Sequence, residues 1–149
     1  MADLMYHNFF YELMIAAIDL TTTTGTQLKM MLLDTNHSAS TVDDAVKTDV
    51  NTNELANTGG YTTDGEDVTK GAMTPTDDDA NDRAYFDINE DIVWATATFS
   101  AYYAVLYDDT HASDALICSY DFGGIKTASG GDFTLQFAAP GSGGAFYIA

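Results

Sequence analysis

The most regular pattern of apolar positions lies in Phe99–Phe122, and it predicts the central hairpin of the fold. In its first half, both the odd and the even positions of Ala101–Tyr107 are apolar. Because successive side chains of a strand point to opposite faces, we expect both faces of this strand to be covered. The polar run DDTHASD predicts the loop, and Ala115–Tyr120 predicts the returning strand. We expect that strand to end at Gly123-Gly124, because glycine tolerates positive φ.

Other short segments show the same strand-like patterns. Three side chains of the hairpin should be buried, namely those of Tyr103, Val105 and Leu116. Further strands are predicted at Gln27–Asp34, at Asp67–Ala72 on a sheet edge, at Arg83–Ile88, from Ile92 through Trp94, and at Phe133–Phe137. Many short strands without β-α-β alternation predict a mainly β fold, an antiparallel β-sandwich or barrel.

The chain start predicts one amphipathic helix. Met5, Phe9, Leu13 and Ala17 recur every four residues, which indicates a helix from about Asp3 to Ala17. With 149 residues we expect a single β domain over 1–149, with this helix in 1–18. Residues 35–71 form a polar surface excursion, and 138–149 form a glycine-rich tail. Within the excursion, Ser40 and Asp43 resemble a capping box before a short helix with Val42, Val46 and Val50 on one edge.

Charge excludes several classes of partner. The chain carries 23 acidic and five basic residues, a net charge of −18. Nucleic-acid binding is not expected, because phosphate contacts require clustered Lys and Arg. Membrane association is not expected either, since no apolar run approaches the roughly 20 residues of a spanning helix. The start, MADLMYHNFFYELM, lacks the basic and continuous apolar parts of a signal peptide.

Catalytic and metal-binding patterns are not found in the sequence. Asp77–Asp82 begins like a calcium loop, but Asp82 stands where Gly is needed and Ile88 where a bidentate Glu is needed. The three histidines, His7, His37 and His111, lack zinc-ligand spacing. We therefore expect no enzyme activity, metal or cofactor, and we expect Cys118 to be a buried thiol and Trp94 a core or interface anchor.

The two chain ends are the candidate contact surfaces. They are too apolar to be left in water at termini that are otherwise polar or glycine-rich. The candidate contacts are Met5, Phe9, Leu13, Met14, Phe146, Tyr147 and Ile148. The alternative is that the helix and the tail only cover the chain's own sheet.

Four segments resemble a family of small virion-associated proteins of tailed phages and prophages. They read IDLTTTTGTQLKMMLLD, NELANTGGYTTDGEDVTK, DDANDRAYFDINEDIVWATATFSAYYAVLYDD and LICSYDFGGIKTASGGDFTLQF, and together they span nearly the whole chain. The resemblance implies a structural virion protein on the capsid surface, a head decoration or cement protein. Its implied partners are the major capsid protein, other virion proteins and further copies of itself.

The sequence is also compatible with two other functions. The first is a tail, neck or head-fibre component that binds carbohydrate or a receptor, with Trp94 and the tyrosines as stacking platforms. The second is a soluble hydrolase, although no motif supports it. The tail PGSGGAFYIA and the strong acidity depart from the family pattern. Acidity of this kind fits either saline surroundings or a surface kept soluble at high local concentration.

Overall fold

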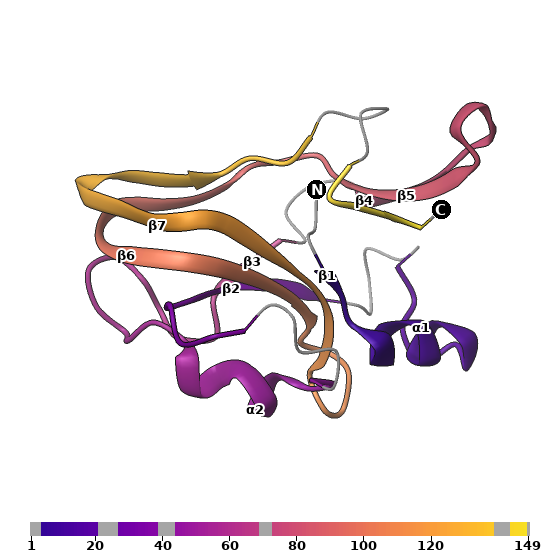
Figure 1. The fold of residues 1–149 in the computed structure, drawn as a ribbon, viewed down its shortest axis with the longest axis horizontal. Helices are drawn as coiled ribbons and strands as arrows, with labels where there is room; N and C mark the ends of the chain where they lie inside the picture. The colour runs from indigo at the N-terminus through magenta and orange to yellow at the C-terminus, as the bar shows by residue number, and fades with distance from the viewer. Residues whose placement is uncertain (1–3, 21–26, 39–43, 69–72, 139–143, 149) are drawn as a thin grey trace.

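The fold is mainly β and contains two antiparallel sheets (Figure 1). The computed structural model describes residues 4–20, 27–38, 44–68, 73–138 and 144–148. The larger sheet has the order β1-β7-β6-β2-β3, with β1 Leu4–Met5, β2 Leu28–Leu33, β3 Glu66–Asp67, β6 Ile92–Asp108 and β7 Ala115–Leu135. The smaller sheet has the order β4-β5-β8, with β4 Met73–Asp78, β5 Arg83–Ile88 and β8 Phe146–Ile148.

The predicted central hairpin is confirmed and consists of β6 and β7. The two strands pair from Asp108 opposite Ala115, next to the loop, to Ile92 opposite Leu135. One carboxylate oxygen of Asp108 orders the loop, because it accepts the backbone N–H groups of Thr110 at 2.9 Å and His111 at 3.1 Å. This side chain is 1% exposed, so its bonds to the loop replace the water that it loses on burial.

The prediction that the returning strand ends at Gly123-Gly124 is wrong, because β7 bends there and continues. Tyr103 pairs with Asp121 and Ala101 pairs with Lys126, so one residue of β6 faces four residues of β7 between these pairs. Both glycines have positive φ, at 66° and 152°. The longer path on β7 bends the hairpin, as β-bulges do. The segments predicted to begin at Ile92 and to cover Phe133–Phe137 therefore belong to the two long strands, apart from residues 136 and 137.

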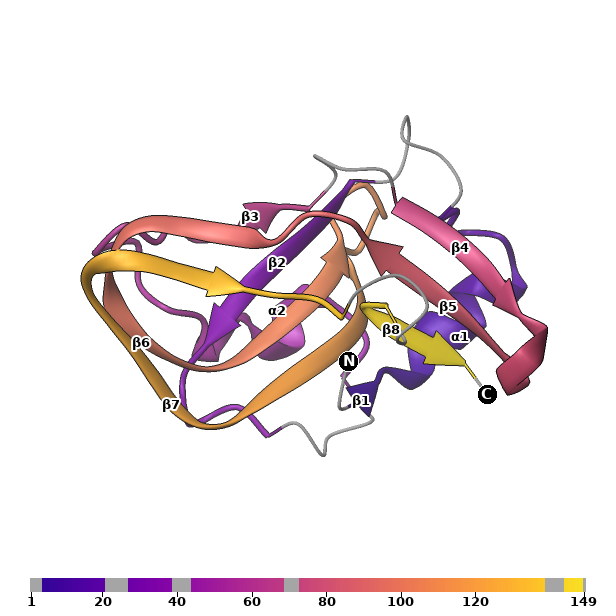
Figure 2. The same ribbon diagram turned by 90° about the horizontal axis from the view of Figure 1, so that it is seen from above.

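The bend folds the hairpin back over itself (Figure 2). Phe122 and Phe133 belong to the same strand, yet their ring centroids are 6.1 Å apart. Eleven residues of straight strand would span roughly 36 Å. Phe99 of β6 joins them, with its ring centroid 5.2 Å from that of Phe133. The fold-back thus gives the far half of the hairpin an apolar inner face of its own.

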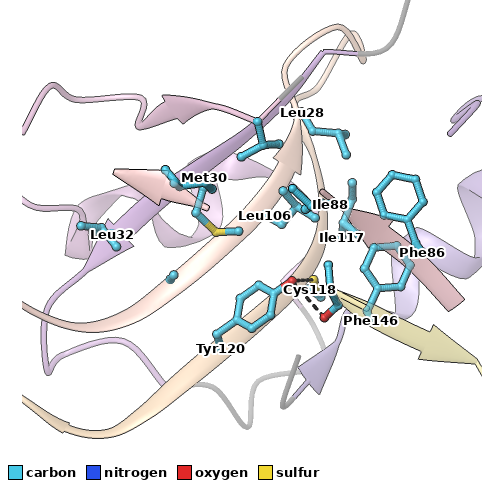
Figure 3. Close-up of a cluster of buried hydrophobic side chains, with 14 of the residues drawn as sticks. Leu28, Met30, Leu32, Phe86, Ile88, Leu106, Ile117, Cys118, Tyr120 and Phe146 are labelled. Carbon is cyan, nitrogen blue, oxygen red and sulfur yellow. Dashed lines mark hydrogen bonds between the residues drawn. The ribbon is translucent and has the colours of Figure 1, made fainter. Parts of the chain in front are cut away.

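The hydrophobic core lies on both faces of the larger sheet, as the sequence predicts. The main cluster includes Leu28, Met30, Leu32, Leu106, Ile117 and Cys118, and it joins Phe86 and Phe146 of the smaller sheet (Figure 3). The second cluster covers the opposite face and contains Tyr6, Met31, Leu33, Val50, Val105, Tyr107 and Leu116. Val105 and Leu116 are fully buried as predicted, whereas Tyr103 is only partly buried at the rim of the second cluster, beside the bend.

The N-terminal helix is shorter than predicted. Helix α1 spans His7–Met14, and Leu4–Met5 form β1 instead, because the N–H of Tyr6 bonds to the Ile117 carbonyl and ties this segment to β7. The helix ends after Met14, and Ala16 has a positive φ of 56°. Tertiary pairing with β7 thus replaces helical hydrogen bonds that the apolar periodicity alone would favour. Asp3, the predicted cap, lies outside the described residues.

The polar excursion contains a second, very short helix. Helix α2 spans Lys47–Val50 and continues into a 3₁₀ turn at Asn51–Asn53. The predicted capping pair Ser40 and Asp43 lies outside the described residues. Instead, the Asp49 carboxylate accepts the N–H groups of Ala45 and Val46 at 2.9 and 3.0 Å. A further 3₁₀ turn, Asp79–Asn81, connects β4 to β5.

Tyr61 anchors the rest of the excursion to the core. Its hydroxyl donates to a carboxylate oxygen of Glu54 at 2.6 Å and accepts the N–H of Leu32 at 3.1 Å. Burial raises the pKa of this hydroxyl far above its ordinary value. Two residues earlier, the Gly59 carbonyl accepts a hydrogen bond from the N–H of Thr98 at 2.7 Å, so the loop covers the edge of β6. A long polar connection is thereby held by buried hydrogen bonds.

Candidate binding groove at the joined chain ends

The N-terminal helix and the C-terminal strand meet inside the protein. Phe9 of α1 packs edge-on against Phe146 of β8, with ring centroids 5.5 Å apart. Phe146 in turn stacks on Phe86 of β5 at 5.1 Å. Phe9 is 0% exposed and Phe146 is 3% exposed, so this aromatic contact joins the two ends of the chain in the core.

Backbone pairing with β5 fixes the position of β8. Phe86 pairs with Phe146 and Ala84 pairs with Ile148, which places these four residues on one face of the smaller sheet. The N–H of Ala145 donates to the Phe86 carbonyl at 2.8 Å. Gly144 precedes it with φ +58°, and a Cβ at this position would overlap the Phe86 carbonyl oxygen. The close approach of the tail to β5 therefore requires glycine.

An apolar groove lies beside this aromatic contact, between α1 with its following segment and the face of the smaller sheet. Its cavity volume is about 440 Å³. The helix side of the groove is lined by Phe9, Leu13, Ala16, Ile18, Asp19 and Leu20, and the sheet side by Pro75, Ala84, Tyr85, Phe86, Phe146 and Ile148. The lining is largely aliphatic and aromatic, so the groove suits apolar side chains rather than a polar reaction.

Acidic residues border the groove. Asp19 is part of its helix side. Asp77 pairs with Ala84 in the β4–β5 ladder and is exposed to solvent at the same end of the sheet. The nearby Arg83 donates to Asp78 at 2.9 Å, and Arg83 also lies 5.5 Å from the ring centroid of Tyr147. Because this arginine already has an acidic partner, it offsets little of the acidity at the rim.

The predicted contact residues divide into four kinds. Phe9, Leu13, Phe146 and Ile148 line the groove, although Phe9 and Phe146 are buried within the chain and form its floor. Met14 is 78% exposed and does not line the groove. Met5 is partly buried in β1 next to Cys118, and the half-buried Tyr147 lies near Arg83 instead. The C-terminal strand thus packs on the chain's own smaller sheet, which is the alternative in which the chain ends cover their own sheet. The groove remains uncovered beside it.

Sequence analysis missed two exposed apolar side chains of this segment. Tyr11 and Ile15 are 53% and 54% exposed, and neither of them lines the groove. The i, i+4 spacing of Tyr11 and Ile15 could have shown that they share a face. The position of Ala84 in the groove lining could not be predicted from the sequence, because it depends on the pairing of β5 with the C-terminal strand β8.

The acidic turn at Asp77–Asp82 is held by internal hydrogen bonds. The Asp78 carboxylate accepts from the side-chain amide of Asn81 at 2.9 Å and from Arg83 at 2.9 Å. These bonds, from Asn81 first and Arg83 second, lower the pKa of Asp78. Within the described residues, no group of three or more His, Cys, Asp or Glu side chains is arranged to hold a metal ion.

The histidines and the tryptophan lie apart from one another. His111 lies 3.4 Å from a carboxylate oxygen of Glu12, whereas His37 is buried edge-on against Tyr103 with ring centroids 5.1 Å apart. His7 is exposed on α1. Trp94 is 1% exposed and packs against Phe133, so it is a core residue with no face open to a ligand. Cys118 is a buried free thiol, as predicted.

No protein family, curated protein or solved structure was found to match the chain. No α-helix among the described residues is long and apolar enough to cross a membrane.

Proposed function

We propose that the protein is a structural component of a tailed-phage particle, a decoration or cement protein that binds the head lattice through the apolar groove. The observation that carries the proposal is the apolar groove of about 440 Å³, on one side of a helical segment that leaves Tyr11, Met14 and Ile15 more than half exposed. Apolar patches of this kind, with a polar surround, mark interaction sites in soluble proteins. A neighbouring protein of the particle would remove this surface from water.

Three further observations support this reading. The resemblance to virion-associated proteins extends over four segments, from Ile18 to Phe137, and none of them carries a catalytic motif. The two antiparallel sheets would act as a rigid β-sandwich scaffold, with the aromatic contact between Phe9 and Phe146 holding both chain ends in place. The net charge of −18 keeps such a protein soluble at the high copy number that a lattice requires.

Locating the protein in reconstructed particles tests the proposal. We expect a copy number that follows the capsid lattice, with α1 facing the major capsid protein. The variant Met14→Ser/Ile15→Ser should fold normally, because both side chains are more than half exposed, and should be lost from particles. Val93→Ser is the matched control, since Val93 is 46% exposed on β6 and away from the groove. Absence from heads, or equal retention of both variants, would contradict the proposal.

A carbohydrate-binding role in a tail, neck or head fibre is the second candidate. One hollow favours it, because the half-exposed Tyr102 lies there beside the polar side chains of Asp34, Thr35 and Ser100. An aromatic ring next to hydroxyl and carboxylate groups is a suitable surface for a sugar ring. Glycan-array binding that is lost in Tyr102→Ala, together with a few copies per particle at the tail, would favour this candidate over decoration.

A further inference from the structure

Strand β8 is a short terminal segment that docks into a site built by the rest of the chain. Among the described strands it pairs only with β5, at the edge of the smaller sheet (Figure 2). Its departure would therefore leave the pairing of the other described strands intact. Phe146 anchors β8, because its ring contacts those of Phe9 and Phe86 and is 3% exposed. The structure thus shows directly that the tail and this site are complementary.

The site also recognises the backbone of the tail. The Tyr120 hydroxyl of β7 donates to the Ala145 carbonyl at 3.2 Å, and the Ala145 N–H donates to the Phe86 carbonyl at 2.8 Å. Ala145 is fully buried, and Gly144 before it leaves no room for a Cβ. These requirements are met by the sequence GAFYI, which every copy of the chain carries. The tail of a second copy therefore has the shape and the hydrogen-bonding groups that the site accepts.

One short connection joins β8 to the body of the protein. Between Ala138 and Gly144 stand five residues with the sequence APGSG. A chain advances at most about 3.3 to 3.6 Å per residue, so the six steps from Ala138 to Gly144 can span up to about 20 Å. This reach is enough for a tail to enter the site of a copy that lies against this edge of the molecule, and too short for a distant one.

We propose that copies held side by side exchange β8, so that the tail of one copy docks on β5 of its neighbour. The exchanged strand makes the same pairing and buries the same ring, so the contact needs no new complementary surface. Exchange of an identical element is a low-cost route to association. The neighbour would then supply Phe146 and Ile148 to the apolar groove, whose lining would be shared between two copies.

Local concentration decides between the two arrangements. A tail on a short connection meets its own site at an effective concentration on the order of millimolar. In dilute solution the chain therefore docks its own tail, as it does in this structure. On a lattice, neighbouring sites reach a comparable local concentration, and exchange becomes competitive. The inference deepens the proposed function and rests on it, because the particle is what holds the copies this close together.

A mixture of two full-length single-cysteine variants tests the exchange. Ala84 and Ile148 pair directly across β5 and β8, at a separation that a disulfide can bridge. The native thiol of Cys118 is fully buried and can remain. When Ala84→Cys and Ile148→Cys are on different chains, tail docking can join them only between copies. We expect covalent heterodimers from oxidised particles that carry both variants, and from the purified mixture at millimolar but not at far lower concentrations.

The matched control is a mixture of Ala84→Cys with Tyr147→Cys. Tyr147 pairs with Tyr85, so its side chain points to the opposite face of β8 and away from position 84. The double variant Ala84→Cys/Ile148→Cys should close within one chain in dilute solution, which verifies the geometry of the pair. A heterodimer yield in heads no greater than that of the control, or a double variant that closes only within one chain even in heads, would overturn the exchange.

The position of the protein in the particle is measured separately. Presence in heads without heterodimers there rejects only the exchange of β8. Heterodimers in the concentrated purified mixture, with the protein absent from heads, reject only the decoration role.

Discussion

The ring of Phe9 meets the ring of Phe146 edge-on at 5.5 Å, and this contact joins the two ends of the chain. Both side chains are buried, and the stack of Phe146 on Phe86 extends the contact into the smaller sheet. The groove beside it depends on this contact, because the buried rings of Phe9 and Phe146 form the bottom of the groove and the more exposed lining residues form its sides.

Phe9→Ala and Phe146→Ala should each destabilise the protein by about 3 to 5 kcal/mol, as expected for a buried aromatic side chain. The double variant should lose less than the sum of the two, because an aromatic pair adds about 0.5 to 1.5 kcal/mol beyond its burial. Chemical denaturation of all four proteins measures this coupling. Tyr11→Ala, at a half-exposed position of the same helix, is the control. Strict additivity would contradict the direct contact.

Gly144→Ala should weaken the docking of β8. The substitution forces a left-handed conformation on alanine, which costs about 1 to 2 kcal/mol, and also pushes its Cβ into the Phe86 carbonyl. Gly123→Ala separates the two effects, because Gly123 has a similar φ of 66° but no atom near the added Cβ. Thermal unfolding should show the larger loss for Gly144→Ala. Equal losses would mean that the close approach of the tail to β5 does not contribute.

Asp87→Asn should stabilise the protein at neutral pH. Asp87 is 3% exposed, and burial raises the pKa of its carboxyl above the ordinary value. The native state therefore holds this proton more tightly than the unfolded state, and the resulting stability is present below about pH 3.9 and lost as pH rises through the native pKa. The side-chain amide of the Asp87→Asn variant does not ionise, so the variant does not lose this stability as pH rises. We expect a higher Tm at pH 7, by about 2 to 4 °C per kcal/mol gained, and an advantage that disappears in acid.

His37 should give the opposite pH dependence. Burial lowers the pKa of its imidazole, so the native state holds it neutral while the unfolded state binds a proton below about pH 6.5. Stability from this residue is complete above that pH and falls as pH decreases toward the native pKa. His37→Phe retains an aromatic ring against Tyr103 and should remove this residue's contribution to the pH dependence of the free energy of unfolding below about pH 6.5. An unchanged slope would show that His37 is not the group responsible.

Leu116→Ala and Tyr103→Ala should differ in their effects, although both residues belong to the central hairpin. Leu116 is fully buried, and its truncation should cost about 2 to 5 kcal/mol. Tyr103 is partly buried at the rim of the same cluster, so its truncation should cost less. Val105→Ala serves as a second buried reference. Equal or reversed losses for Leu116 and Tyr103 would contradict the burial that the structure assigns to them.

Local patterns in the sequence were sufficient to predict β2, β5 and the pairing of the central hairpin. These elements are specified by period-two alternation and by a polar loop between two apolar runs, and such information is contained in neighbouring residues. The burial of Val105, Leu116 and Trp94 followed from the same patterns. The sequence also determined the acidic surface and the apolar character of both chain ends.

Only the tertiary structure decided where these pieces meet. Gly123-Gly124 indicates a break in a strand, but whether β7 stops or bends depends on continued pairing with β6. The apolar periodicity around Met5 indicates a helix, yet pairing with Cys118 places this residue in β1. The groove requires contact between Phe9 and Phe146, which are separated by nearly the whole chain. Long-range contacts of this kind arise from packing and closure of the complete chain, and no local pattern encodes which distant surface a segment will cover.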